Sequence, residues 1–276
     1  MGSDDPGSLQ PMIVRKQMIV AQLVKGPGRV ASYDFTTRRL YVAGDLAAGT
    51  IVELDRTAAN YLLSVLRLPD GAEILVFNGR HGEWRARVEA TGRRGGRLAV
   101  LQATRPQTDP PDIHLLFAPL KHARLDYAVQ KATEMGAGAL QPVLTRRTVA
   151  TRVNEDRMRA NVIEAAEQCG VLSVPDVRPP LAFPDALLRL APDRLVVFAD
   201  EDAPSGNPLA ALAGRPAGTP AALLVGPEGG FDPDERAAIL ARPNLCRISL
   251  GPRILRADTA AVAALALLQA SVGDWR

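Results

Sequence analysis

The sequence predicts an α/β protein in which a parallel sheet flanked by helices follows a smaller, β-rich domain. From residue 113 to residue 271, short apolar runs alternate with helical patterns, which is the arrangement of a parallel sheet with crossover helices. Residues 40–101 instead show short strands separated by turn residues. A polar, proline-rich segment lies between the two patterns, so we expect domains at 30–105 and 112–276 joined by a linker at 106–111.

The first domain is expected to be a small β-barrel or sandwich. Residues 1–11 carry no periodic pattern. They resemble residues added by an expression vector and are left out of the fold prediction. Strands are predicted at 49–54, 72–77, 83–88 and 97–101, with turns at Asn78-Gly79 and Gly95-Gly96. One helix is predicted at 57–66, with Ala58, Leu62 and Val65 on one face.

The second domain is expected to contain five parallel strands. They are predicted at 113–118, 139–144, 194–199, 221–225 and 246–250, with helices at about 124–135, 155–169, 233–241 and 258–271. The 155–169 helix follows Asn154, a suitable N-cap, and its apolar face consists of Met158, Val162, Ala165, Ala166 and Cys169. Asp232-Pro-Asp-Glu235 predicts a capped start for the 233–241 helix, because a cap, a proline and an acid follow in the favoured order.

Two glycine-rich segments near the C-terminus are the strongest functional signal. They read Leu-Leu-Val-Gly-Pro-Glu-Gly-Gly-Phe at 223–231 and Ile-Ser-Leu-Gly-Pro-Arg-Ile-Leu-Arg-Ala-Asp-Thr-Ala at 248–260. Each follows a strand and precedes a helix, which places both at the carboxyl edge of the sheet, where open α/β proteins bind ligands. Two ordinary strand-to-helix turns are the alternative. The pairing of the segments, with Arg253, Arg256 and Asp258 in the second, favours one shared pocket.

The pocket is not predicted to bind a dinucleotide or a polyphosphate. The spacing Gly-x-x-Gly-Gly does not match the dinucleotide fingerprint, and there is no P-loop. Glu228 within the first segment would repel phosphate groups in the absence of a metal ion, whereas a cationic or zwitterionic ligand would be tolerated. The sequence therefore favours a cationic cofactor.

The charge of the chain is unevenly distributed. The net charge is +3, and residues 30–105 hold 11 arginines, no lysine and 8 acidic residues. An arginine-rich stretch, in which Glu89 is the sole acid, comprises Arg85, Arg87, Arg93, Arg94, Arg97 and Arg105. Arginine is suited to bidentate recognition of phosphate, so contact with a nucleic acid is favoured over a solvated basic hairpin.

Several other classes of protein are disfavoured. Cys169 and Cys246 are far apart, and the histidines do not combine with them in a metal-binding spacing, so neither a disulfide framework nor a metal site is expected. The longest apolar run, 260–268, is too short to cross a membrane, and no signal segment opens the chain. A cytoplasmic protein without a membrane partner is expected.

These motifs together resemble the RsmE family, the uridine-N3 methyltransferases of small-subunit (16S) ribosomal RNA within the SPOUT class. The resemblance rests first on the two glycine-rich segments. It extends to Lys121, to Gln-Lys-Ala-Thr-Glu-Met-Gly at 130–136, to Glu-Ala-Ala-Glu-Gln-Cys-Gly at 164–170, and to Val-Leu-Arg at 65–67 followed by Asp70-Gly71. The similarity covers nearly the whole chain after about residue 38.

The resemblance implies a PUA-like RNA-binding barrel followed by a SPOUT domain with a deep trefoil knot. It also implies a homodimer that binds S-adenosylmethionine and acts on the small ribosomal subunit. Cofactor contacts would fall on Val225, Gly226, Glu228, Gly229, Gly230, Leu250, Gly251, Leu255 and Thr259, and RNA contacts on Arg67, Arg85, Arg87, Arg94 and Lys121. Three residues depart from the family pattern: Asn60 stands where histidine is common, Val171 where arginine is common at an RNA-facing position, and Asp258 where glutamate is common.

Two residues of the second segment suit the chemistry of methyl transfer to uridine. Loss of the N3 proton develops negative charge on the base, which Arg256 could stabilise through a carbonyl oxygen. Asp258 could orient Arg256 or accept the proton, while a structural pair with Arg256 or a simple helix cap is the alternative. A non-catalytic RNA-binding protein and a nucleotide-dependent α/β enzyme of another class are the competing functions.

Overall fold

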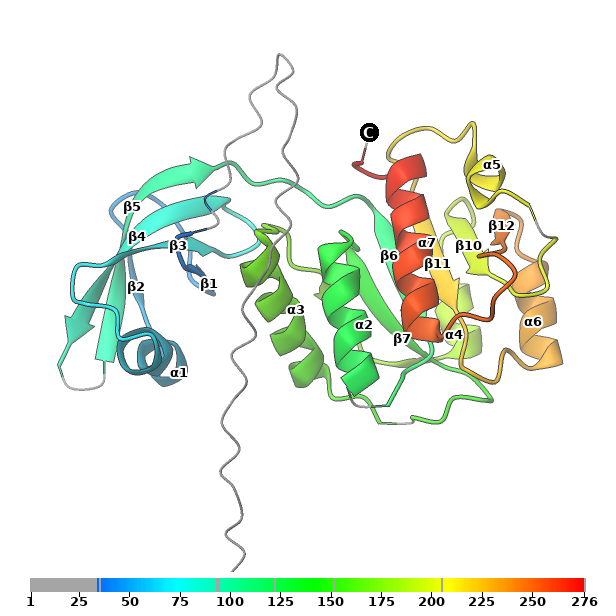
Figure 1. Ribbon diagram of the computed structural model, residues 1–276, viewed down its shortest axis with the longest axis horizontal. Helices are drawn as coiled ribbons and strands as arrows, with labels where there is room; N and C mark the ends of the chain where they lie inside the picture. The colour runs from blue at the N-terminus through cyan, green and yellow to red at the C-terminus, as the bar shows by residue number, and fades with distance from the viewer. Residues whose placement is uncertain are drawn as a thin grey trace, which may run out of the picture. The chain divides into compact units, whose positions relative to one another are not determined.

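The structure is a computed structural model that describes residues 34, 36–92, 95–121, 123–150, 152–204 and 206–275 (Figure 1). Its N-terminal part is a five-stranded sheet in the order β1-β3-β4-β5-β2. The strands are β1 (Arg39–Tyr41), β2 (Ile51–Glu53), β3 (Glu73–Phe77), β4 (Glu83–Thr91) and β5 (Gly95–Arg105). β1 pairs with β3 in parallel and the other pairs are antiparallel. The predicted β-rich domain is therefore confirmed, and β1 is an addition that the sequence did not indicate.

The long strands β4 and β5 are antiparallel neighbours. Thr91, at the end of β4, pairs with Gly95, at the start of β5. The predicted turn at Gly95-Gly96 is wrong, because both glycines belong to β5. Their lack of a side chain allows close packing: a Cβ on Gly96 would lie 3.3 Å from the side chains of Leu54 and Leu63. Gly92, with φ +76°, supplies the left-handed conformation at the start of the reversal.

The predicted helix at 57–66 is present but changes type along its length. It starts as α1 (Arg56–Asn60), capped by the Asp55 side chain, and continues as the π-helix η1 (Tyr61–Val65). The wider π turn, closed by Leu66 N–H donating to the Tyr61 carbonyl at 2.9 Å, changes the angular spacing of the side chains. Leu62 is buried as predicted, whereas Val65 is 62% exposed rather than part of the apolar face.

The C-terminal part is a seven-stranded sheet in which all strand pairs are parallel, as predicted. The order is β12-β10-β11-β6-β7-β8, with β9 paired to β7. The strands are β6 (Ile113–Phe117), β7 (Ala139–Leu144), β8 (Asp176–Val177), β9 (Leu181–Ala182), β10 (Leu195–Ala199), β11 (Ala221–Val225) and β12 (Leu245–Ile248). β8 and β9 are too short to give a pattern in the sequence.

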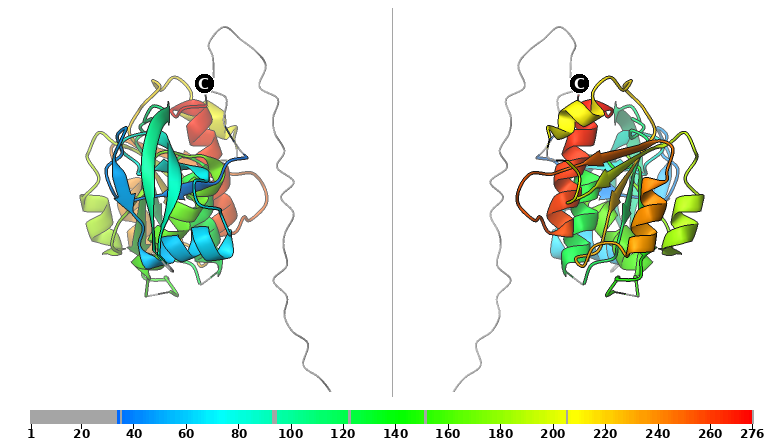
Figure 2. Two further views of the ribbon diagram at one scale, coloured as in Figure 1. Left: turned by 90° about the vertical axis from the view of Figure 1, so that its left-hand side faces the viewer. Right: turned by 90° about the vertical axis from the view of Figure 1, so that its right-hand side faces the viewer.

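Helices cover both faces of this sheet. α2 (Ala123–Glu134), α3 (Glu155–Cys169) and α7 (Ala257–Ser271) lie side by side on one face, where α5 (Pro208–Leu212) also packs (Figure 1). α4 (Phe183–Leu188) and α6 (Pro233–Leu240) cover the other face. The right-hand view of Figure 2 shows α7 in red and α6 in orange on opposite sides of the strands. The four predicted helices are confirmed, and α4 and α5 are additional.

The caps predicted for two helices are confirmed. The Asn154 side chain accepts a hydrogen bond from Arg157 N–H at the start of α3. Asp232 and Glu235 form a reciprocal capping box at the start of α6. The apolar face of α3 is correct for Met158, Val162, Ala165 and Ala166, whereas Cys169, at the last turn, is exposed.

A small apolar cluster joins β3 to α3. Phe77, Ala166 and Leu172 are buried there, and Val171 packs against them. Tyr41 N–H donates to the Glu167 carboxylate at 2.8 Å, while burial raises the pKa of that carboxyl group. Val171 therefore has a packing role in this chain, which accounts for an apolar residue at a position where the family resemblance suggested arginine.

Candidate functional site

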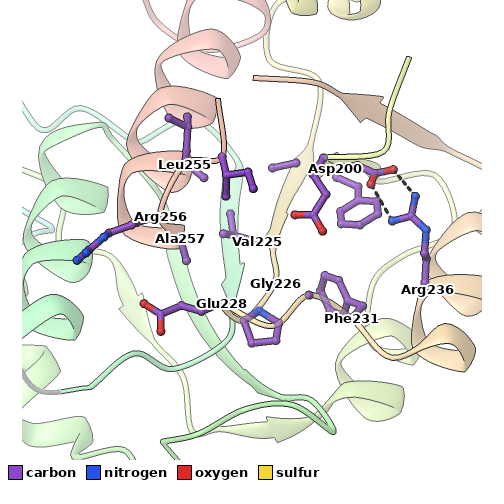
Figure 3. A pocket seen from close by; sticks show the side chains of 16 residues that line it. Asp200, Val225, Gly226, Glu228, Phe231, Arg236, Leu255, Arg256 and Ala257 are labelled. Carbon is purple, nitrogen blue, oxygen red and sulfur yellow. Dashed lines mark hydrogen bonds and ion pairs between the residues drawn. The ribbon is translucent and has the colours of Figure 1, made fainter. Parts of the chain in front are cut away.

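A cavity of about 260 Å³ lies at the carboxyl ends of β10, β11 and β12 (Figure 3). Three chain segments and α6 enclose it. Its lining comprises Phe198, Ala199, Asp200, Glu201, Val225, Gly226, Pro227, Glu228, Gly230, Phe231, Arg236, Ile254, Leu255, Arg256, Ala257 and Ala260. The two glycine-rich segments therefore share one pocket, as the sequence predicted. The contribution of β10 and α6 was not predicted.

The first glycine-rich segment is shaped by its contact with an aromatic cluster. A Cβ on Gly226 would lie only 2.7 Å from the ring of Phe231, so the ring packs directly on the backbone. That ring in turn lies with its centroid 5.5 Å from those of Phe183 and Phe198. Gly230 has φ +69°, a conformation that other residues rarely adopt. Glycine is thus required at Gly226 by space and at Gly230 by backbone angle.

Two arginines from other elements hold the same segment, and a third holds the start of α6 beside it. Arg124, at the start of α2, pairs with the Glu228 carboxylate. Arg147 donates to the Gly229 carbonyl at 2.8 Å, and Arg146 donates to Asp234 at 2.7 Å. Arg124 and Arg147 therefore tie the segment to α2 and to the loop that follows β7, while Arg146 ties that loop to the start of α6.

The second glycine-rich segment leads into α7. Gly251 has φ +98°, and Arg256 is the N-cap residue of the helix. The Arg256 side chain is exposed, makes no capping hydrogen bond, and has no ion-pair partner in the part of the chain that the structure describes. Ile254 is 94% exposed beside it. The segment thus presents a free guanidinium and an unburied apolar side chain at the pocket.

A buried ion-pair network closes the β10 side of the pocket. Asp200 is fully buried and accepts hydrogen bonds from Arg236 (2.7 and 3.0 Å) and Arg247 (2.6 Å). Burial raises the pKa of Asp200, but the hydrogen bonds from the two guanidinium groups outweigh it and leave the pKa below its usual value. The Arg236 guanidinium also lies 5.6 Å from the centre of the Phe198 ring. Figure 3 shows Asp200 and Arg236 on the opposite side of the pocket from Arg256 and Glu228.

The predicted cofactor residues divide into those that line the cavity and those that do not. Val225, Gly226, Glu228, Gly230 and Leu255 line it, as does Arg256. The remaining predicted residues, Gly229, Leu250, Gly251, Thr259 and the predicted catalytic Asp258, belong to the same two segments but are not part of the lining. Asp258 is not the helix cap, because it follows the cap by two residues and accepts a hydrogen bond from Thr259 N–H at 2.8 Å.

Sequence reasoning missed Asp200, Glu201 and Arg236. The signal for them was weak: a run of three acids, Asp200 to Asp202, directly after an apolar strand, and an arginine one turn into a capped helix. Their role depends on β10 lying between β11 and β12, which strand order alone decides.

Of the predicted RNA-binding residues, Arg85 and Arg87 lie on β4, Arg67 follows η1 and Lys121 precedes α2. Arg87 is exposed on β4 and has no ion-pair partner among the described side chains, whereas Arg85 lies 3.5 Å from Glu73. Arg67 is exposed, with a left-handed φ of +53°, and Lys121 is exposed just before α2. Arg94 lies outside the described residues.

Some arginines of the arginine-rich stretch form ion pairs within the protein, which the sequence did not suggest. Arg97 pairs with Glu89 at 2.7 Å, and Arg105 is nearly buried, 3.4 Å from the Glu83 carboxylate. Strand pairing brings acids from neighbouring strands next to these arginines, which local sequence could not reveal.

No metal centre or membrane span is found in the described residues. They contain no group of three or more His, Cys, Asp or Glu side chains that could hold a metal ion. None of their helices is both long and apolar enough to cross a membrane.

Comparison with known proteins identifies the class of this fold and pocket. A family model described as an RNA methyltransferase domain matches residues 107–269, and one described as an RNA methyltransferase PUA domain matches residues 54–101. The two glycine-rich segments belong to the first match. The fold and site are therefore those of an RNA methyltransferase with an N-terminal PUA domain.

Similar proteins define the family more narrowly. The ribosomal RNA small subunit methyltransferase E of Synechocystis is 32% identical over 95% of this chain and 87% of its own length. The corresponding Neisseria gonorrhoeae enzyme, solved with S-adenosylmethionine, superposes with a TM-score of 0.73 at 27% identity, covering 87% of this chain and all of that one. A Legionella pneumophila protein, also solved with that cofactor, gives 0.75 at 28% identity over 86% and 99% of the two chains. This chain belongs to the ribosomal RNA small subunit methyltransferase E family.

Proposed function

We propose that this protein transfers the methyl group of S-adenosylmethionine to N3 of a uridine in 16S ribosomal RNA of the small ribosomal subunit. The observation that carries the proposal is the single cavity formed by both glycine-rich segments at the carboxyl edge of the sheet. Two relatives of the same fold were solved with this cofactor bound, and the Synechocystis relative is named for ribosomal RNA methylation. A protein that only bound RNA would have no need for this pocket.

The residues of the pocket fit a cofactor that combines an apolar body with positive charge. Val225, Leu255 and Ala260 supply apolar walls, and the backbone of Gly226 and Gly230 also lines the cavity. Carboxylates at Asp200, Glu201 and Glu228 line the cavity. The residues that would hold the cofactor are Val225, Gly226, Glu228, Gly229, Gly230, Leu250, Gly251, Leu255 and Thr259. When bound, the cofactor supplies an electrophilic methyl group on a sulfonium.

Arg256 is the proposed catalytic residue. Removal of the uridine N3 proton leaves negative charge spread over N3 and the two carbonyl oxygens of the base. A guanidinium without a protein partner, held at a helix start on the pocket wall, can donate to one of these oxygens and stabilise that charge. Asp258, two residues further on, orients Arg256 or accepts the proton; its bond to Thr259 N–H leaves acceptor capacity for either role.

RNA contacts are proposed at Arg67, Arg85, Arg87, Arg94 and Lys121. Exposed arginine and lysine neutralise phosphates, and such contacts fix the register of a nucleic acid without reading its bases. Arg67 supports this proposal further, because its left-handed backbone costs stability that a surface residue would otherwise avoid.

The proposal extends to the assembly, the chain path and the location of the protein. The protein acts as a homodimer, for which the exposed Ile254 beside the pocket offers an apolar contact. The domain boundaries are 30–105 and 112–276, the second containing a trefoil knot near the cofactor pocket. Ribosomal RNA as substrate places the protein in the cytoplasm.

The function is tested by cofactor binding and by product analysis. Calorimetry should detect binding of S-adenosylmethionine and S-adenosylhomocysteine but not of ATP. Mass spectrometry of 16S ribosomal RNA from a deletion strain should show the loss of one N3-methyluridine, restored by the wild-type gene. An unchanged modification pattern in that strain would contradict the proposal.

A further inference from the structure

Two adjacent carboxylates at the end of β10 face the same pocket but differ in their surroundings. Asp200 is fully buried and accepts hydrogen bonds from Arg236, Arg247 and the Asp202 N–H. Its charge is therefore fully compensated by the protein. Asp200 fixes the pocket wall and has no free capacity for a ligand.

Glu201 differs in every one of these respects. Its side chain is exposed and makes no hydrogen bond or ion pair within the described part of the chain. A Cβ on Gly230 would lie 3.6 Å from its Oε1, so the carboxylate stands beside the first glycine-rich segment. The third acid of the lining, Glu228, is paired with Arg124. Among the acidic side chains that line the cavity, Glu201 is thus the one without a hydrogen bond or ion pair in the described part of the chain; it attracts the Arg236 guanidinium only at longer range, and that guanidinium is paired with Asp200.

A carboxylate without an ion-pair partner on the wall of a pocket distinguishes ligands by charge. S-adenosylmethionine carries a sulfonium and has a net charge of +1, whereas its demethylated product, S-adenosylhomocysteine, has a neutral sulfur and no net charge. The two are otherwise nearly the same in shape. The Coulomb attraction of a nearby carboxylate therefore stabilises the first complex more than the second, and it strengthens as the ligand excludes water from the pocket.

We propose that Glu201 is a specificity-determining residue that makes the pocket prefer the charged methyl donor over the neutral product. The inference rests on the proposed function, because it assumes that the cavity binds this cofactor. Loss of the sulfonium charge during transfer would then weaken the hold of the pocket on the product and favour its release.

The test compares Glu201→Gln with the wild-type protein by calorimetry, using S-adenosylmethionine and S-adenosylhomocysteine as separate ligands. We expect the affinity for S-adenosylmethionine to fall by roughly three- to tenfold, with a much smaller change for S-adenosylhomocysteine. Glu201→Asp, which retains the charge, should keep most of the preference. Glu53→Gln removes one exposed carboxylate from β2 in the other sheet and should change neither affinity. High salt should shrink the difference between Glu201→Gln and wild type.

The possible outcomes separate this inference from the proposed function. Equal losses for both ligands would show that Glu201 contacts groups they share, such as ribose hydroxyls, and would overturn selection by charge. An unchanged ratio and unchanged affinities in Glu201→Gln would overturn it as well. Failure of the wild-type protein to bind either ligand would instead contradict the proposed function itself.

Discussion

Gly226 offers the sharpest test of how the pocket is built. The substitution Gly226→Ala places a Cβ 2.7, 3.0 and 3.3 Å from three ring atoms of Phe231, where ordinary contacts lie at 3.4–4 Å. The ring cannot move away freely, because Phe183 and Phe198 pack against it. Either the ring or the glycine-rich segment must shift.

The expected cost follows from these contacts. Overpacking by one methyl group in a packed cluster costs about 1–3 kcal/mol. Replacement of glycine by alanine recovers about 0.4–1 kcal/mol, because the unfolded chain loses conformational freedom. We therefore expect the free energy of unfolding to fall by roughly 1–2 kcal/mol, which corresponds to a decrease in Tm of a few degrees. The affinity for S-adenosylmethionine should fall at least tenfold, since the displaced segment is part of the pocket wall.

The assays are thermal and denaturant unfolding together with calorimetric titration of the cofactor. Gly229→Ala is the matched control, because its Cβ would lie 3.8 Å from the Arg147 side chain and Gly229 does not have a left-handed φ; it should change the stability by less than about 0.5 kcal/mol. Phe231→Leu combined with Gly226→Ala should recover part of the lost stability, as expected when two residues share a clash. Equal stability of Gly226→Ala and wild type, or a larger loss in Gly229→Ala, would refute this reasoning.

Three further predictions concern other parts of the site. Arg256→Ala should lower the single-turnover methyl-transfer rate at saturating cofactor by roughly 10²–10³ with little change in cofactor affinity, and Arg256→Lys should recover only part of it; normal transfer by the alanine variant would exclude the catalytic role. Asp200→Asn should lower the free energy of unfolding at neutral pH by about 3 kcal/mol. Because the folded-state pKa of Asp200 lies below its unfolded value, this contribution is complete above about pH 4 and is lost as the pH falls further, so the melting curves of variant and wild type should converge in acid and not in base. Arg87→Gln should weaken RNA binding and make the slope of log affinity against log salt concentration shallower by about one. An unchanged slope would place the RNA surface elsewhere.

Local sequence determined the elements and the position of the pocket. Alternating strands and helices after residue 112 required a parallel sheet, and parallel strands bring their carboxyl ends to one edge. The segments at 223–231 and 248–260 both leave that edge, so their meeting in one pocket followed from pattern and connectivity. The caps at Asn154 and Asp232 could also be predicted from the sequence, because capping depends on residues within one turn of the helix.

Tertiary structure alone decided which residues the pocket uses and which charges remain free. Asp200 and Arg236 are 36 residues apart, and only strand order and helix packing join them. Glu228 and Glu201 carry the same charge in the sequence, but Arg124 forms an ion pair with the first and no described side chain forms one with the second. Gly226 and Gly229 were also indistinguishable until the Phe231 ring was placed against one of them. Charge compensation and steric contact depend on atoms a few ångströms apart in space, and their partners can come from any part of the chain.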